Sequence, residues 1–295
     1  AAIEAPSANI ELQLKKTRDL AAQLTNTEWF ISMPGTAAQK QPLIECMSCH
    51  TFERIARSKH NAGAMYEVLK RMATYAINTT PDVKQLRAKP RPFNETTFRA
   101  LAAYLASVNL SKGDKWNYAL KTLPRPRGRA TRVLITEYDL PRKTIAPHDV
   151  ITDAAGIAWY SNFLENTLGR LDPKTGAHTE YTWPTVKPNA AKGSLAMEPD
   201  RDGNWWLATM FQTGLVRFNV KNNTFTVFPL PAELNNSEAQ QSMVQPRQSH
   251  VDGKVWATDI GRQVILRLDL ASGKYELIDP FKFMPEGTNH SPYGL

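Results

Sequence analysis

The sequence predicts two domains of different class: a small all-α domain over residues 1–112, then a partial β-propeller of four-stranded blades over residues 133–295. Apolar residues recur at helical spacing in the first part, most clearly over residues 61–76. From residue 131 on, the chain instead repeats itself with a period of about 50 residues. Between the two patterns lies a stretch rich in Pro, Arg and Gly, residues 113–132, which predicts a solvated linker.

Helices are expected in order along the first domain. Residues 10–24 have a rough helical period that residues 25–27 stop, and these can cap a short turn that begins at Glu28. A second helix is expected from about Ala37 into residues 46–50. Residues 61–76 predict the clearest helix, because one face carries Met65, Val68, Leu69, Met72, Ala73 and Ala76. Asn94 is expected to cap the last helix, which residues 111–113 close.

Cys46, Cys49 and His50 form the pattern C-x-x-C-H, the attachment motif for a c-type haem. Two such thiols can reach the two vinyl carbons on one edge of a haem, and His50 is then held under the iron as the proximal ligand. Half a zinc site is an alternative, but no second Cys pair exists in the chain. A redox dithiol is another, but no βαβ pattern surrounds the motif. The sequence therefore predicts one covalently bound haem c.

The iron needs a sixth ligand or an open site, and a Met sulfur raises the potential and suits electron transfer. Met33, Met65 and Met72 are the candidates, although a Met on a helix stripe commonly packs in a core. His60 stands in a polar turn and is expected at the surface. The segment from the motif to Arg71 and Met72 resembles small class I cytochromes c, in which a helix ending in an Arg-Met pair follows C-x-x-C-H. The resemblance implies Met72 as the sixth ligand.

The second domain is defined by three markers that recur in the same register. Tryptophans stand 47 and 50 residues apart, at Trp159, Trp206 and Trp256, and the same spacing separates Arg170, Arg217 and Arg267. Two residues after each Arg stands Asp172, Asn219 or Asp269, and six residues after it Gly176, Asn223 or Gly273. Each unit has about four short strand signals, which is typical of a propeller blade. We expect the Trp to pack between blades and the Arg and Asp to form hydrogen bonds around the turns.

Residues 147–150, 158–160, 168–176 and 180–181 resemble the streptogramin lyase (virginiamycin B lyase) family of propellers, and the likeness covers roughly residues 131–295. In that family a blade-opening His and a Glu help build a metal-assisted site. The resemblance implies a channel site for a divalent metal at His148, His250 and His290. The Glu position, however, is held by Asn162, Thr209 and Asp259.

A haem segment followed by such a propeller, with residues 29–36 before the haem motif, also resembles a group of exported bacterial c-type cytochromes. The start of the chain, residues 1–3, resembles what remains after cleavage of a signal peptide. Haem c is attached outside the cytoplasm, so a periplasmic or otherwise exported protein is expected. The residues after the linker suffice for about three and a half repeats, whereas propellers close with about 4–8 blades. We therefore expect that Leu295 is not the natural end.

The net charge of +8 favours an acidic redox partner or peripheral association with an anionic membrane surface. No nucleic-acid motif accompanies the basic residues, and no apolar run reaches the ~18 residues of a membrane span. The sequence thus predicts a periplasmic electron-transfer cytochrome whose propeller docks a dehydrogenase or another cytochrome, or binds a substrate. The alternative is a redox enzyme, or a metal-dependent lyase-like enzyme, with its site in the propeller channel.

Overall fold

The computed structural model describes residues 13, 15, 19–133, 135–285, 288 and 290–294. Contacts divide the chain into two compact units, Ala1–Glu67 with Thr96–Arg132 and Val68–Glu95 with Val133–Leu295. Residues 68–95 thus group with the sheets, and the expected bounds at residues 112 and 133 stay a prediction. The expected helix over residues 10–24 lies largely outside the described residues, and its described part is the 3₁₀-helix η1, Leu20–Gln23.

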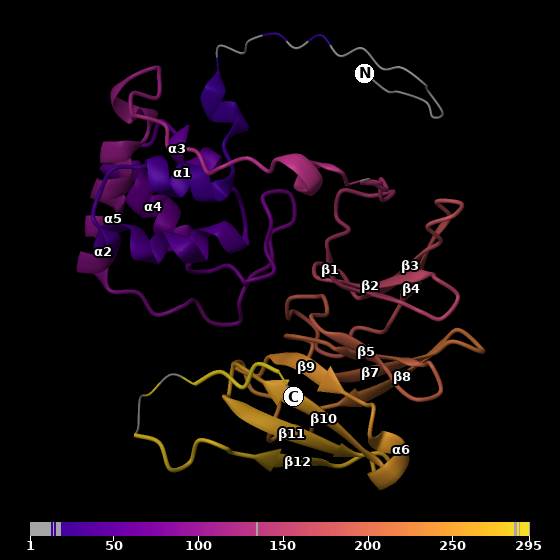
Figure 1. The fold of residues 1–295 in the computed structure, drawn as a ribbon. Helices are drawn as coiled ribbons and strands as arrows, with labels where there is room; N and C mark the ends of the chain where they lie inside the picture. Colours follow the sequence, from indigo (N-terminus) through magenta and orange to yellow (C-terminus); the bar gives the residue numbers. More distant parts are fainter. Residues whose placement is uncertain are drawn as a thin grey trace. The chain divides into compact units, whose positions relative to one another are not determined.

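Every described helix or 3₁₀-helix outside the sheets is short or of moderate length. They are η1, α1 (Asn26–Ser32), α2 (Ala37–Lys40), η2 (Gln41–Ser48), α3 (Phe52–Ala56), α4 (Ala62–Met72), α5 (Glu95–Val108), η3 (Leu110–Lys112) and η4 (Gly128–Thr131) (Figure 1).

Local sequence accounts for several of these boundaries. Thr25 accepts a hydrogen bond from the amide of Glu28 while the Glu28 carboxylate accepts one from Thr25, which is a capping box. The helix predicted over residues 61–76 is confirmed as α4 but ends earlier, at Met72. It ends there because the chain turns into a short antiparallel bridge between Tyr75 and Leu86.

The expected solvated linker is only partly correct, because residues 116–125 pack against the helices of the first unit. The Trp116 ring meets buried Trp29 edge-on at 4.8 Å between centroids. The Ser32 hydroxyl accepts a hydrogen bond from the amide of Lys121 at 2.8 Å. Buried Glu28 forms an ion pair with Arg125, 2.7 Å between Oε1 and Nη1. Sequence composition marks this stretch as a linker, but its one Trp and its backbone amides supply partners for the helices.

The second unit contains three antiparallel sheets of four strands, each joined in sequence order (Figure 1). The first holds β1 (Pro147–Thr152), β2 (Ala158–Asn162), β3 (Thr167–Leu171) and β4 (His178–Thr182). The second holds β5 (Met197–Pro199), β6 (Trp205–Ala208), β7 (Gly214–Asn219) and β8 (Thr224–Pro229). The third holds β9 (Gln241–Gln245), β10 (Lys254–Asp259), β11 (Val264–Asp269) and β12 (Tyr275–Ile278). This up-and-down order confirms the predicted four-stranded blades.

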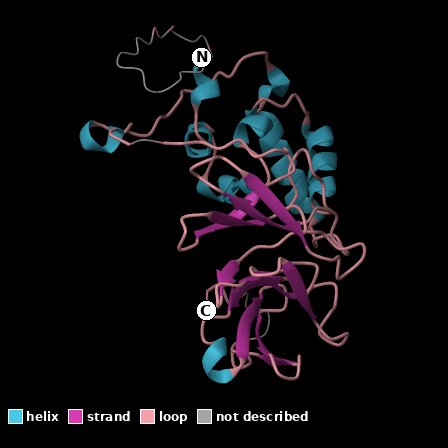
Figure 2. Ribbon diagram, turned by 90° about the vertical axis from the view of Figure 1, so that its right-hand side faces the viewer, coloured by secondary structure: helices cyan, strands magenta, loops and turns pink. Residues whose placement is uncertain are grey.

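One short helix within the blades, α6 (Ser249–Asp252), was not expected from the sequence (Figure 2). It stands between β9 and β10, where the other two blades have only a turn. Among the described residues, no helix combines the length and the apolar character needed to cross a membrane.

The repeated tryptophans pack between blades, as predicted, where a following blade is described. Trp159 of the first blade lies 5.7 Å from Trp205 and 5.9 Å from Phe218 of the second, between ring centroids. Trp206 is 1% exposed in a core that includes Val255 of the third blade. Trp256 occupies the matching position in the third blade and is only half-buried.

The repeated arginines bear out the predicted turn contact in one blade, where Arg217 Nε donates to Asp200 at the turn between β5 and β6. Each lies opposite the Trp of its own blade in the β-ladder, and its guanidinium stacks over the indole at 5.9, 5.9 and 5.3 Å for Arg170, Arg217 and Arg267. The predicted turn contacts are confirmed for the next marker, since Asp172, Asn219 and Asp269 each accept a hydrogen bond from a backbone amide of the turn. The last marker has positive φ, which explains Gly176, Asn223 and Gly273 there.

Candidate functional site

The haem motif lies at the end of a 3₁₀-helix rather than an α-helix. η2 runs from Gln41 to Ser48, and Cys49 follows it with helical backbone angles. Residues i and i+3 eclipse each other in a 3₁₀-helix, so the side chains of Cys46 and Cys49 project from one face. Leu43, one turn earlier on that face, is fully buried. Both thiols therefore lie on the side of the helix that faces the interior of the unit, and both are half-buried.

His50 is held in one tautomer by its neighbour. Its Nδ1 lies 3.1 Å from the carbonyl oxygen of Thr51. A carbonyl only accepts hydrogen bonds, so Nδ1 carries the proton and Nε2 carries the lone pair. Iron-ligating imidazoles use this arrangement, in which a backbone carbonyl fixes the ring and leaves the other nitrogen for the metal.

The protonation of Cys46 bears on the redox-dithiol alternative. Burial, with Glu45 and Cys49 nearby, raises the pKa of the Cys46 thiol to about 11. Redox-active C-x-x-C pairs depend on a lowered thiol pKa, since the thiolate is the reactive form. The two cysteines of the chain, both in the described part, are not joined in a disulfide. The raised pKa of Cys46 thus disfavours a redox dithiol.

The candidate sixth ligands fall into two groups. Met33 and Met65 are buried core residues of the first unit, at 1% and 3% exposure. Met72 is half-buried at the last residue of α4 and belongs to the second unit. His60 is exposed, as expected, and its backbone carbonyl accepts a hydrogen bond from Asn109. Met72 stays the predicted ligand.

The three propeller histidines are each engaged separately. His148 lies on β1, where Nδ1 is 2.9 Å from Asp149 and the ring stacks on Phe163. His250 lies on α6 with its Nδ1 2.9 Å from the carbonyl of Arg247. The ring of His290 stacks on Phe281 at 4.7 Å, and its Nε2 is buried without a hydrogen-bond partner. In the part of the chain that the structure describes, no three His, Cys, Asp or Glu residues come together as a metal-binding group.

Strand register corrects the placement of His250 as a blade-opening residue. Val150 pairs with Tyr160, Met197 with Leu207 and Val244 with Ala257. These partners follow the tryptophan spacing, so the position of His148 corresponds to Leu195 and Ser242 in the other blades. His250 instead stands six residues before Trp256, where the other blades have Asp153 and Asp200. These two carboxylates accept hydrogen bonds from the indole nitrogens of Trp159 and Trp206.

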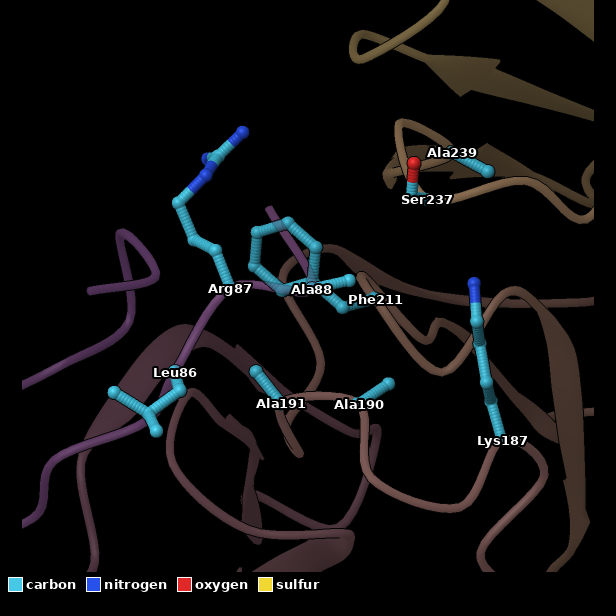
Figure 3. A pocket seen from close by; sticks show the side chains of 9 residues that line it. All are labelled: Leu86, Arg87, Ala88, Lys187, Ala190, Ala191, Phe211, Ser237 and Ala239. Atoms are coloured by element: carbon cyan, nitrogen blue, oxygen red, sulfur yellow. The ribbon is translucent and has the colours of Figure 1, made fainter. Parts of the chain in front are cut away.

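A pocket in the second unit carried no motif and was missed by sequence reasoning. It lies where residues 86–88 meet three loops of the blades, and it is lined on opposite sides by Arg87 and Lys187, with Phe211 between them (Figure 3). No periodicity relates these residues, which are about 100 positions apart in the sequence. Only the fold brings them together.

Comparisons with known proteins find likeness in the solved structures alone: no protein-family profile and no curated sequence matches the chain. A streptogramin B lyase structure has 21% identity and a TM-score of 0.39, over 48% of this chain and 43% of that chain. A catalytically inactive virginiamycin B lyase from Staphylococcus aureus with quinupristin has 24% identity and a TM-score of 0.40, over 50% and 45%. The extracellular domain of a one-component system from B. thetaiotaomicron has 15% identity and a TM-score of 0.34, over 44% and 16%. The chain spans less than half the length of each of these three structures.

Proposed function

We propose that the protein is an exported c-type cytochrome that carries electrons through one haem bound to Cys46, Cys49 and His50. The main support is the motif's local geometry: a 3₁₀ turn that eclipses the two cysteines, followed by a histidine whose Nε2 is left as the ligating nitrogen. The haem, when bound, supplies an iron that cycles between ferrous and ferric states. The residues fit it, because both thiols lie on the face of η2 that carries buried Leu43.

The proposal extends to the sixth ligand and to the partner. Met72 ends α4 and is only half-buried, so its thioether is less committed to a core than those of Met33 and Met65. The net charge of +8 favours an acidic redox partner, either a dehydrogenase or another cytochrome. In this proposal the blades serve as a rigid docking platform for that partner.

The test is the absorption spectrum of the protein expressed with a haem c maturation system, oxidised and reduced. We expect a covalent haem that stays with the chain after denaturation, and its loss when Cys46 and Cys49 are both replaced by Ala. His50→Ala should change the iron's spin state, while the matched variant His60→Ala should not. A chain that matures without haem under these conditions would refute the proposal.

The sixth ligand is tested in the same preparations. A Met-ligated ferric haem has a weak long-wavelength sulfur-to-iron band, which we expect in the wild type and not in Met72→Leu. Met65→Leu conserves volume in the same helix and should retain the band. Loss of the band in Met65→Leu alone would move the ligand to that residue, and a high-spin wild type would mean that the sixth site is open.

Of the two alternatives, a redox enzyme and a metal-dependent lyase-like enzyme, only the first has an observation in its favour. A redox enzyme with a substrate site in the blade region is favoured by one observation, the pocket beside Arg87 and Lys187. The metal-dependent lyase-like alternative has no such observation, because the described histidines do not converge.

A further inference from the structure

Positive charge is concentrated in one segment of the first unit, residues 112–132, called here the basic segment. It holds three lysines and four arginines, and its one acidic residue is Asp114. In residues 133–295, which include the blades, Asp and Glu outnumber Lys and Arg. Charge therefore directs an acidic partner to the helical unit rather than to the blades.

Contacts with α5 and α1 hold the first part of the basic segment in one course. The Tyr118 hydroxyl donates to the carbonyl of Ser107 in α5 at 2.9 Å, and the amide of Leu123 donates to Glu28 Oε1 in α1 at 2.9 Å. Further along, residues 128–131 form η4. The charged side chains thus project from a backbone of defined course, which lowers the entropy cost of binding a partner.

Most cations of the basic segment have no carboxylate partner. Arg125 is paired with Glu28, and Asp114 is paired with Lys59 at 3.1 Å. Among the residues that the structure describes, no ion pair includes any of the segment's other cations, which are all exposed: Lys112, Lys115, Lys121, Arg127, Arg129 and Arg132. A surface with this excess of one charge is complementary to an acidic partner.

Lys40 of α2 extends this surface to the start of the haem segment, because η2 begins directly after it. Its Nζ donates to the carbonyl of Phe30 at 3.0 Å, and the Lys121 amide donates to the Ser32 hydroxyl at 2.8 Å, so both lysines are attached to the end of α1. Burial and the charge of Lys121 lower the pKa of Lys40. Two cations that repel each other in this way both gain from a carboxylate placed beside them.

A hollow of about 180 Å³ lies at the start of the basic segment. Lys112, Lys115, Trp116 and Tyr118 are among the residues that line it, and no described Asp or Glu does. The Trp116 and Tyr118 rings meet edge-on, 4.8 Å between centroids. Trp and Tyr are enriched among the residues that contribute most to protein interfaces. The hollow is large enough to take one side chain of a partner.

We infer that the basic segment, with Lys40, docks an acidic protein whose carboxylates pair with these free cations. The fork of Arg matches the two oxygens of a carboxylate. Sites for single-stranded nucleic acid stack bases on aromatic rings, and helices that lie on membranes bury an apolar face. Residues 119–132 contain no aromatic residue, and their one described helix is η4, of four residues. The inference deepens the proposed function: the partner is then the acidic redox partner, and its charged contact is with the helical unit.

The test is binding of the full chain to poly-L-glutamate, measured by isothermal titration at low ionic strength. We expect binding that weakens as salt is added, because exposed charges are screened. The triple variant Arg127→Gln, Arg129→Gln, Arg132→Gln should weaken it about tenfold, the combined effect of three exposed ion pairs. The double variant Lys40→Gln, Lys121→Gln should weaken it by a smaller factor, because two pairs are lost.

The matched control is the triple variant Arg201→Gln, Lys221→Gln, Lys274→Gln. It removes the same charge from exposed connections between strands of the blades. This control should leave binding unchanged. Equal weakening in the two triple variants would overturn the inference, because net charge alone would then account for binding.

Two other polyanions distinguish the class of partner. Vesicles of phosphatidylcholine with phosphatidylglycerol present phosphate at a membrane surface, and a single-stranded oligonucleotide presents it on a nucleic acid. Tighter binding to either than to poly-L-glutamate, compared per negative charge, would overturn the assignment to a protein. Haem content is measured in the same preparations. A haem-free chain that binds would refute the haem proposal alone, and a haem-loaded chain that does not bind would refute the docking surface alone.

Discussion

The contacts that stabilise the blade region internally differ in kind from those that stabilise the helical unit internally. In the blades, one cross-strand pair of Trp and Arg occurs three times, in each sheet with the same register. In the helical unit, the contacts between distant segments do not recur at a fixed spacing, such as the Glu28–Arg125 ion pair and the hydrogen bond from Tyr104 to the carbonyl of Pro34 at 2.8 Å. A repeated contact is visible in a single sequence, whereas a contact that occurs once is not.

The repeated Trp has two features, its stacking with Arg and its burial, and the third blade has the first without the second. The stacking of Arg on Trp needs only one blade, and all three blades have it. Burial of the Trp needs a neighbouring blade, and it is nearly complete only for Trp159 and Trp206, at 6% and 1% exposure. The Asp that accepts from the indole accompanies these two and is replaced by His250 before Trp256.

The largest effect is expected from removing a Trp that lies between blades. Trp206→Ala should lower the free energy of unfolding by about 3–5 kcal/mol, because it leaves a cavity in a closed core. Trp256→Ala, in the same position of the third blade, should cost clearly less, because that side chain is already half-exposed. Urea unfolding followed by far-UV circular dichroism measures both. Equal losses would mean that Trp256 is covered in solution.

A smaller effect is expected from the indole's acceptor. Asp200 accepts from Trp206 Nε1 and from Arg217 Nε, each at 3.1 Å, and its side chain is 8% exposed. Asp200→Ala should cost about 1–3 kcal/mol, since it leaves buried donors without a partner. The matched variant His250→Ala should stay within about 0.5 kcal/mol, because that residue is exposed and its Nδ1 contacts the carbonyl of Arg247. A large loss in His250→Ala would assign it a structural role in the third blade.

Much of the blade region could be predicted from the sequence, because turn residues and Trp recur in register. Positive φ at Gly176, Asn223 and Gly273 is one such case, since the turn demands it in every blade. The stacking of the arginines on the tryptophans was not predicted, because spacing shows that a residue recurs but not which neighbour it contacts. α6 was missed since it occurs in one blade only.

The candidate sites differ in the same way. Cys46, Cys49 and His50 lie within one short stretch of the chain, so their motif can be identified from the sequence alone. Arg87 and Lys187 line the same pocket because Gln85 and Gln212 bind backbone groups of distant loops. A hydrogen bond between one side chain and one distant loop produces no recurring pattern and no motif in the sequence. The pocket could not be predicted for that reason.

The last prediction concerns the Glu28–Arg125 contact of the helical unit, whose contribution to stability depends on pH only below neutral pH. The amide of Thr25, then Arg125 and the amide of Leu123, lower the pKa of Glu28 from 4.5 to about 2. A carboxylate with a lowered pKa in the folded state stabilises that state fully above its unfolded pKa, and this stabilisation is lost as the pH falls through the folded pKa. The stability that Glu28 contributes should therefore be constant above pH 4.5 and disappear toward pH 2.

The difference in urea midpoint between wild type and Glu28→Gln, measured along this pH range, reports the contribution directly. It should be constant near neutral pH and shrink below pH 4.5. In an Arg125→Met background the difference near neutral pH should be smaller and its loss complete at a higher pH, because Glu28 has lost one of the groups that lower its folded-state pKa. An identical profile in both backgrounds would show that Arg125 does not hold Glu28 in solution, and residues 116–125 would then return to the free linker that their composition suggests.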